Sequence, residues 1–316
     1  ITGGTGFVGQ HLVSQLTRRE LFHKLAVRSQ VENPSNPKFI SVGDINAHTP
    51  WTQALAGVTD VVHLAARVHI TQETSSDAYA AFRAVNTEGT LHLARQAAAA
   101  GVRRFVFLSS IKVNGEGKPQ AYLETDTPDP EDAYAVSKWE AEQGLWKISA
   151  ATGMQMVILR IPLVYGPGVG ANFLQLFQTV NKGWPLPLGG IANRRSLLYI
   201  GNLVDAMLVA LENPDAANKL YLLSDGQDVS TSQLVERMAQ ALNKTPRLFS
   251  LPQGMLRLAA SVLGKSSAVD RLYGSLYLDS AKIRQELSWI PPFSMQQGLA
   301  ETAQWFLKAQ DSSASS

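Results

Sequence analysis

The chain has 316 residues, 45% of them hydrophobic, and a formal net charge of +2 at pH 7. This size and composition suit one large globular domain or a domain with an appendage. Acids and bases are mixed along the chain, which argues against a nucleic-acid-binding patch. The chain contains no cysteine, so disulfides and thiolate metal sites are excluded. We expect no metal site, and a reducing, cytoplasmic location fits this composition. No apolar run reaches the roughly 18–20 residues that span a bilayer.

The amino end is unusual, because Ile1 stands directly before the turn Thr2-Gly3-Gly4. A strand normally leads into such a turn. We interpret the sequence as lacking most of its first strand, which would be the central strand of the predicted sheet.

Short β-branched apolar runs alternate with helical stretches over the first two-thirds of the chain, as in parallel βαβ units. The predicted strands are Lys24–Arg28, Phe39–Val42, Asp60–Leu64, Phe105–Ser109, Met156–Arg160 and Leu197–Ile200. The predicted helices are Val8–Arg19, Thr52–Ala56, Asp77–Ala100 and Asp132–Ala151. This order predicts an α/β fold with a Rossmann-type doubly wound parallel sheet.

The character of the chain changes beyond about Pro162, where loops become rich in glycine and proline. Later helices, such as Ser232–Leu242 and Ser294–Leu307, no longer alternate strictly with strands. We therefore predict a dinucleotide-binding domain over residues 1–165 and a small C-terminal substrate-binding lobe over 166–309, interleaved with the last elements of the sheet. We expect the polar tail 310–316 to be disordered.

The first motif with chemical meaning is rich in glycine. Gly3, Gly6 and Gly9 have the spacing G-x-x-G-x-x-G and open a predicted helix. Gly3 permits the tight turn, Gly6 lets a pyrophosphate approach the backbone, and Gly9 allows close packing of helix and strand. The amino end of the helix then faces the anion. An ordinary glycine-rich turn is the alternative interpretation.

The second motif pairs Tyr134 with Lys138, four residues apart, which places both side chains on one face of a helix. We expect the Lys138 ammonium to lower the pKa of the phenol, so that Tyr134 exchanges a proton with a sugar or alcohol oxygen. Ser110 ends a predicted strand, at the edge where open α/β sheets bind ligands, and its hydroxyl can bond the same oxygen. A solvated helix face and a simple turn serine are the alternatives.

Together these residues resemble the extended short-chain dehydrogenase/reductases of the nucleotide-sugar epimerase/dehydratase family, and the resemblance covers nearly the whole chain. It implies C4 redox chemistry on a nucleotide-diphosphate sugar, with Tyr134 as general acid/base and Lys138 at the nicotinamide ribose. It also implies a homodimer formed through the helices over 77–100 and 132–151. The segment 63–66 resembles the loop that packs against the cofactor, in which we expect His63 to be structural.

The resemblance further assigns two sets of contacts. Cofactor contacts are implied for Gly3, Gly6, Phe7, Val8, Gly9, Arg28, Asp44, Ile45, Leu64, Ala65, Ala66, Asn86, Tyr134 and Lys138. Substrate contacts are implied for Ser110, Asn172, Arg195 and Arg271. Within these sets, Asp44 would accept from the adenine amino group, Asn86 would bond backbone beside the active site, and Arg195 would bind the substrate diphosphate.

Two departures from the family pattern bear on the reaction. The strand 24–28 ends in Arg28 instead of the acid that grips the ribose 2′-hydroxyl, which favours NADP(H) over NAD(H). The lysine that 4-epimerases often carry after the segment 63–66 is absent, and Arg67 stands there. We therefore favour reduction of a UDP-4-keto-6-deoxy sugar, with a UDP-sugar 4-epimerase holding bound NAD as the alternative.

Other functions are less favoured by the sequence. A 4,6-dehydratase typically carries Asp-Glu directly after the serine, where this chain has Ile111 and Lys112. A non-enzymatic dinucleotide sensor has no need of an intact serine, tyrosine and lysine set. A reductase of non-nucleotide ketones has no need of the diphosphate matches at Asn172 and Arg195. The identity of the sugar and its C2 and C6 substituents stay open.

Overall fold

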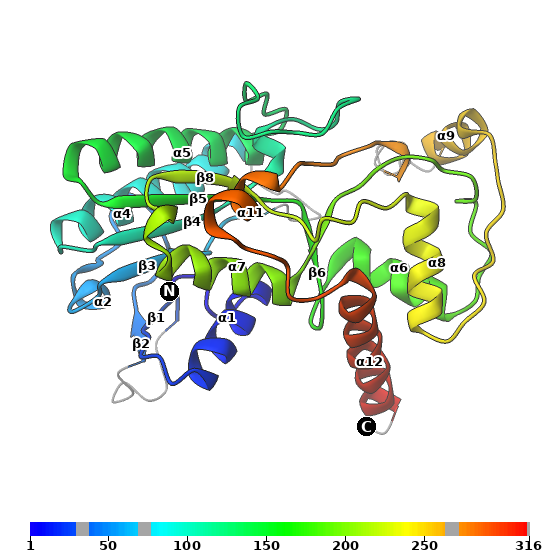
Figure 1. The fold of residues 1–316 in the computed structure, drawn as a ribbon, viewed down its shortest axis with the longest axis horizontal. Helices are drawn as coiled ribbons and strands as arrows, with labels where there is room; N and C mark the ends of the chain where they lie inside the picture. Colours follow the sequence, from blue (N-terminus) through cyan, green and yellow to red (C-terminus); the bar gives the residue numbers. More distant parts are fainter. Residues whose placement is uncertain (30–37, 69–76, 263–271, 315–316) are drawn as a thin grey trace.

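The computed structural model describes residues 1–29, 38–68, 77–262 and 272–314. Its centre is a parallel sheet (Figure 1) formed by β1 (Leu25–Val27), β2 (Phe39–Ser41), β3 (Asp60–His63), β4 (Arg104–Ser110), β5 (Gln155–Ile161) and β8 (Lys219–Leu222). β2 pairs with β1, and the other strands follow in the order β3-β4-β5-β8. Thr2 joins the two groups through bridges to Ala26 and His63. The Rossmann-type doubly wound parallel sheet predicted from the sequence is confirmed.

Helices cover both faces of this sheet (Figure 1). They are α1 (Phe7–Arg18), α2 (Thr52–Leu55), α3 (Ala78–Phe82), α4 (Thr90–Ala99), α5 (Ala133–Thr152) and α7 (Ile200–Glu212). Alternate residues of β4 face opposite layers: Phe107 belongs to the buried cluster of Leu145 in α5, and Val106 to that of Leu12 in α1. This alternation follows from the period of two along a strand. The predicted helix over 77–100 is continuous, but a π-helical segment, η1 (Arg83–Gly89), lies between α3 and α4.

The remaining elements build a lobe to one side of the sheet or connect to it (Figure 1). They are β6 (Leu163–Tyr165), β7 (Leu197–Tyr199), α6 (Ala171–Asn181), α8 (Thr231–Ala241), α9 (Gln253–Val262), α11 (Ala281–Leu287), α12 (Met295–Ala314) and the 3₁₀ turns η2 (Ile111–Val113) and η3 (Pro214–Ala216). β6 and β7 pair in parallel, apart from the main sheet. None of the described helices is long and apolar enough to cross a membrane.

The carboxyl end of the chain differs from the expectation of a disordered tail. α12 continues to Ala314, so residues 310–314 are helical in the structure. A tertiary contact accompanies this extension, because Asn181 of α6 donates a hydrogen bond to the Gln310 side chain at 3.2 Å.

Candidate active site

The glycine-rich turn lies at the carboxyl edge of the sheet, where Thr2 leads toward α1. Gly3 has a φ of +68°, and a Cβ there would come within 2.7 Å of the Ala65 backbone nitrogen. A Cβ on Gly9 would lie 2.1 Å from the Gly3 carbonyl oxygen, so both positions require glycine. Gly6 is exposed, and a Cβ there would meet only the Gly3 oxygen at 3.3 Å. Since α1 also has no side-chain cap, the turn presents uncovered backbone, which fits the pyrophosphate of a dinucleotide.

The predicted adenosine contacts lie beyond β1 and β2. Arg28 Nε is 3.1 Å from an Asp44 carboxylate oxygen, and both side chains are about four-fifths exposed, at 82% and 78%. Ile45 follows and faces Gly89, where a Cβ would come within 2.7 Å of an Ile45 methyl group. Sequence reasoning treated Arg28 and Asp44 separately, although they form one ion pair. Asp44 therefore offsets the positive charge that a 2′-phosphate would meet at Arg28.

Asn86 lies in the π-helical segment η1 and is fully buried. Its side-chain oxygen accepts from the Arg67 backbone N–H at 2.8 Å, and its amide donates to the Arg67 carbonyl and the Ser137 hydroxyl, both at 3.0 Å. Both amide hydrogens are thus used by the protein. Asn86 thus joins the segment that follows Ala66 to α5, and its described hydrogen bonds hold these two parts of the chain together.

Ser110 and Tyr134 come together although they stand far apart in the sequence. Ser110 ends β4, and Tyr134 lies in the first turn of α5, whose start is capped by Asp132 accepting from the Ala135 N–H at 2.7 Å. Burial raises the pKa of Tyr134 to about 12, and a hydrogen bond with Ser110 acts in the opposite direction. The serine and the phenol can therefore share one substrate oxygen.

Lys138 is 2% exposed, and its ammonium donates to the Leu108 carbonyl oxygen at 3.0 Å. It also lies 4.5 Å from the centre of the Phe107 ring. Burial lowers the pKa of Lys138 to about 7, against the opposing charge of Glu142. The sequence predicts that Lys138 lowers the pKa of Tyr134, but in the structure burial of the phenol raises that pKa. The described hydrogen bond of Lys138 is to the Leu108 carbonyl of β4 and not to Tyr134.

A buried ionic network that the sequence did not predict lies one helical turn beyond Lys138 on α5. Arg160 of β5 donates to Glu142 of α5 through Nε and Nη2, at 3.0 and 2.5 Å, and both side chains are at most 2% exposed. Ser109 donates a short hydrogen bond to Glu142, and Arg160 donates to Asn114 at 2.8 Å. Glu142 stands four residues after Lys138 on α5, and this spacing was the one sequence signal that could have indicated the network.

His63 is fully buried between two hydroxyls, with Nδ1 2.7 Å from Thr2 Oγ1 and Nε2 2.8 Å from Thr90 Oγ1. Burial lowers the pKa of His63 to about 3, with the Lys138 charge as a smaller cause. A neutral imidazole that joins two strand ends and a helix is structural, as the sequence predicts.

Two of the predicted substrate contacts, Asn172 and Arg195, lie in the lobe. Asn172 is exposed at the start of α6. Arg195 is partly buried, pairs through its backbone with Val229 and Leu276, and donates from its guanidinium to the Gly274 carbonyl at 3.2 Å. The fourth predicted substrate contact, Arg271, lies outside the described residues.

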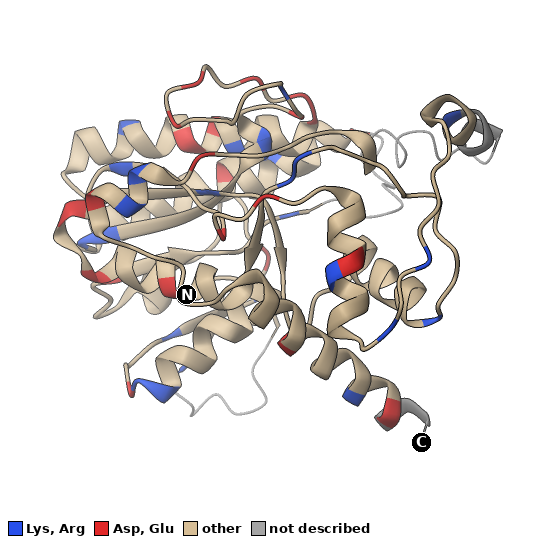
Figure 2. Ribbon diagram, turned by 45° about the vertical axis from the view of Figure 1, so that its right-hand side comes forward, with Lys and Arg blue, Asp and Glu red and all other residues tan. Residues whose placement is uncertain are grey.

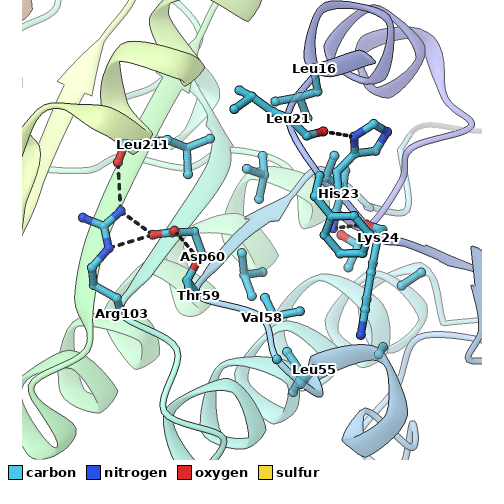
Figure 3. Close-up of a pocket in the computed structure, with 18 of the residues that line it drawn as sticks. Leu16, Leu21, His23, Lys24, Leu55, Val58, Thr59, Asp60, Arg103 and Leu211 are labelled. Atoms are coloured by element: carbon cyan, nitrogen blue, oxygen red, sulfur yellow. Dashed lines mark hydrogen bonds and ion pairs between the residues drawn. The ribbon is translucent and has the colours of Figure 1, made fainter. Parts of the chain in front are cut away.

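A cavity of about 340 Å³ lies elsewhere, where β3 and β4 begin (Figure 3). Arg103 donates to Asp60 at 2.7 Å across it, and Lys24 and Leu211 also line it. Because ligands of open α/β sheets bind at the carboxyl ends of the strands, this cavity at the amino ends is separate from the candidate site.

Comparison with known proteins supports this picture. Residues 1–223 match the model of the NAD dependent epimerase/dehydratase family. The chain belongs to this family. A UDP-glucose 4-epimerase of Vibrio cholerae is 45% identical over 98% of this chain and 95% of its own length. An N-acetyl-α-D-glucosaminyl-diphospho-undecaprenol 4-epimerase of Escherichia coli is 28% identical over 96% of this chain and 94% of its own length.

Solved structures of the epimerase/dehydratase type share the fold. A UDP-glucose 4-epimerase of Thermotoga maritima, determined with UDP-glucose, superposes with a TM-score of 0.76 at 24% identity and 98% coverage of both chains. A UDP-N-acetylglucosamine 4-epimerase of Bacillus cereus gives 0.77 at 20% identity, covering 96% of this chain and 97% of that one. The predicted family and the short-chain dehydrogenase/reductase type of enzyme are confirmed. For the reaction, the relatives support the 4-epimerase alternative better than the 4-ketoreductase that the sequence favours.

Proposed function

We propose that this enzyme is a UDP-sugar 4-epimerase that retains NAD and interconverts UDP-glucose with UDP-galactose, or their N-acetyl forms. The 45% identity to the Vibrio cholerae epimerase, which extends over 98% of this chain, carries the proposal. The proximity of Ser110 to Tyr134, where the serine hydroxyl lowers the pKa of the phenol, supports it.

The chain's own residues fit a nicotinamide dinucleotide. The exposed backbone at Gly6 and the uncapped amino end of α1 suit its pyrophosphate, and Leu64, Ala65 and Ala66 follow β3 beside Gly3. A bound dinucleotide supplies reversible hydride acceptance. The Arg28–Asp44 ion pair leaves little net charge for a 2′-phosphate, which supports NAD over NADP in this proposal.

The proton steps fall to Ser110, Tyr134 and Lys138. Tyr134 takes the proton from the C4 hydroxyl when the sugar is oxidised and returns it when the keto sugar is reduced, while Ser110 bonds the same oxygen. Holding the phenolate at neutral pH requires a large drop from a pKa of about 12. We assign Lys138, four residues on in α5, to the nicotinamide ribose. Its described hydrogen bond is to the Leu108 carbonyl oxygen, so Lys138 does not by itself supply this drop.

We assign binding of the substrate diphosphate to Asn172 and Arg195. We also propose that the reaction takes place in the cytoplasm.

We further propose a homodimer formed through α4 and α5. A groove of about 770 Å³ runs between these helices, and Ala99 of α4 and Ala151 of α5 are small, exposed residues that line it. Small side chains let helix backbones of two copies approach closely.

A 4-ketoreductase is the second candidate, favoured by Arg28 at the end of β1. Incubation of the purified enzyme with UDP-glucose, without added cofactor, separates the two. We expect UDP-galactose to form and NAD to be released on denaturation. Stoichiometric consumption of NADPH with a UDP-4-keto-6-deoxy sugar, and no conversion of UDP-glucose or its N-acetyl form, would overturn the epimerase proposal.

A further inference from the structure

The outer end of the lobe is built from two segments and a helix. The segments lie side by side, because Leu186 forms a parallel bridge with Leu248 and its carbonyl accepts from the Phe249 N–H at 3.0 Å. α9 follows the second segment, and Figure 1 shows it at the outer edge of the lobe, away from the sheet. This end therefore projects from the side of the molecule opposite α4 and α5.

Large apolar side chains are exposed on this end. Trp184 is 60% exposed, Phe249 44% and Met255 61%. Trp184 stands two residues before Leu186 of the bridge, and Met255 lies in the first turn of α9. Removing such side chains from water is favourable, so a partner that covers this end gains free energy from their burial.

The described residues of this end are basic and include no acid. No Asp or Glu occurs at positions 143–204 or 237–262 of the sequence. Lys182, Lys244 and Arg247 are exposed, and none of them forms an ion pair with another described residue. Figure 2 shows blue segments and no red ones along the outer turns of the lobe beyond α8. The ammonium of Lys182 lies 5.0 Å from the centre of the Trp184 ring.

We propose that this end of the lobe docks on the surface of an anionic lipid bilayer. Its basic side chains would meet the negative headgroups, where each cation contributes on the order of fivefold in affinity. Trp184 suits the headgroup level, and Met255 the acyl boundary below it. A protein partner fits less well, because lysine is depleted at protein interfaces, whereas helices that lie on membranes are rich in Lys and Arg.

Sedimentation of the full chain with lipid vesicles tests this proposal. We expect vesicles that contain phosphatidylglycerol to bind on the order of one hundredfold more tightly than pure phosphatidylcholine, with loss of binding at high salt. Lys244→Gln with Arg247→Gln should weaken binding roughly 10–30-fold, and Trp184→Ser about tenfold. Ile290→Ser is the matched control, since Ile290 is 76% exposed on the connection between α11 and α12.

Thermal melting of each variant separates lost docking from lost folding, and Met255→Ser replaces Trp184→Ser if that variant melts early. The proposal is wrong if the chain sediments with neither kind of vesicle or equally with both. An equal loss with Ile290→Ser would also contradict it. Self-association that Trp184→Ser abolishes, without vesicle binding, would assign this surface to a second copy of the chain instead.

Discussion

Replacing Arg160 by methionine tests the buried network behind the catalytic residues. The substitution would leave the Glu142 carboxylate, which is 0% exposed, with the Ser109 hydroxyl as its remaining described hydrogen-bond donor. Breaking a buried pair from one side costs about 3–5 kcal/mol. At about 2 °C per kcal/mol for a chain of this size, we expect the melting temperature to fall by roughly 6–10 °C.

The double variant Glu142→Leu with Arg160→Met gives the decisive comparison, because replacing both ions by apolar groups removes the uncompensated charge. We expect it to recover at least half of the loss, although the Asn114 side-chain oxygen also loses the Arg160 donor. Lys219→Met is the control, since its ion pair with Glu286 is 40% and 32% exposed, and we expect a change within about 1 kcal/mol. Additive losses in the double variant, measured by thermal melting, would refute this interpretation of the network.

Three further predictions concern the site itself. Tyr134→Phe should lower turnover about 10²–10⁴-fold while UDP affinity stays within a few-fold; turnover assays and calorimetry check this, and retained turnover would exclude Tyr134 as the proton-transfer group. Arg195→Ala should weaken UDP binding by about 1.5–3 kcal/mol and spare dinucleotide binding in calorimetry, whereas unchanged UDP affinity would mean that another residue holds the diphosphate. Arg28→Ala should change the preference between NAD and NADP by no more than about 1 kcal/mol, because the Arg28–Asp44 ion pair is exposed. Asp44→Asn should improve NADPH binding. A larger effect of Arg28→Ala would restore the NADP assignment.

Strands β1 to β5 could be predicted from the sequence because they are short apolar runs. Strand β8 was not predicted, and the predicted strand Leu197–Ile200 corresponds to β7, which pairs with β6 outside the main sheet. The same local reasoning placed Gly3 and Gly9 at positions where the structure leaves no room for a Cβ. It also placed Ser110 at a strand end and Tyr134 at a helix start, and their meeting follows from the parallel topology.

The network of Glu142 and Arg160 could not be predicted in the same way. Arg160 reads as the end of an apolar strand, and its partner lies on a helix 18 residues earlier. Whether the pKa of Tyr134 is raised or lowered depends on how deeply the phenol is buried, and the spacing of residues along a helix does not determine that burial. The π-helical segment buries Asn86, Thr87 and Gly89 and no large apolar side chain, so the apolar periodicity gave no sign of it.

The fate of the hydrogen on C4 tests the proposed epimerase most directly. We would incubate the purified enzyme with UDP-glucose deuterated at C4, add no cofactor, and examine the products by mass spectrometry and NMR. An enzyme that removes and returns the same hydride should give UDP-galactose with the deuterium still on C4. No conversion of the deuterated UDP-glucose, together with stoichiometric oxidation of NADPH when a UDP-4-keto-6-deoxy sugar is supplied instead, would contradict the proposal and point to a ketoreductase.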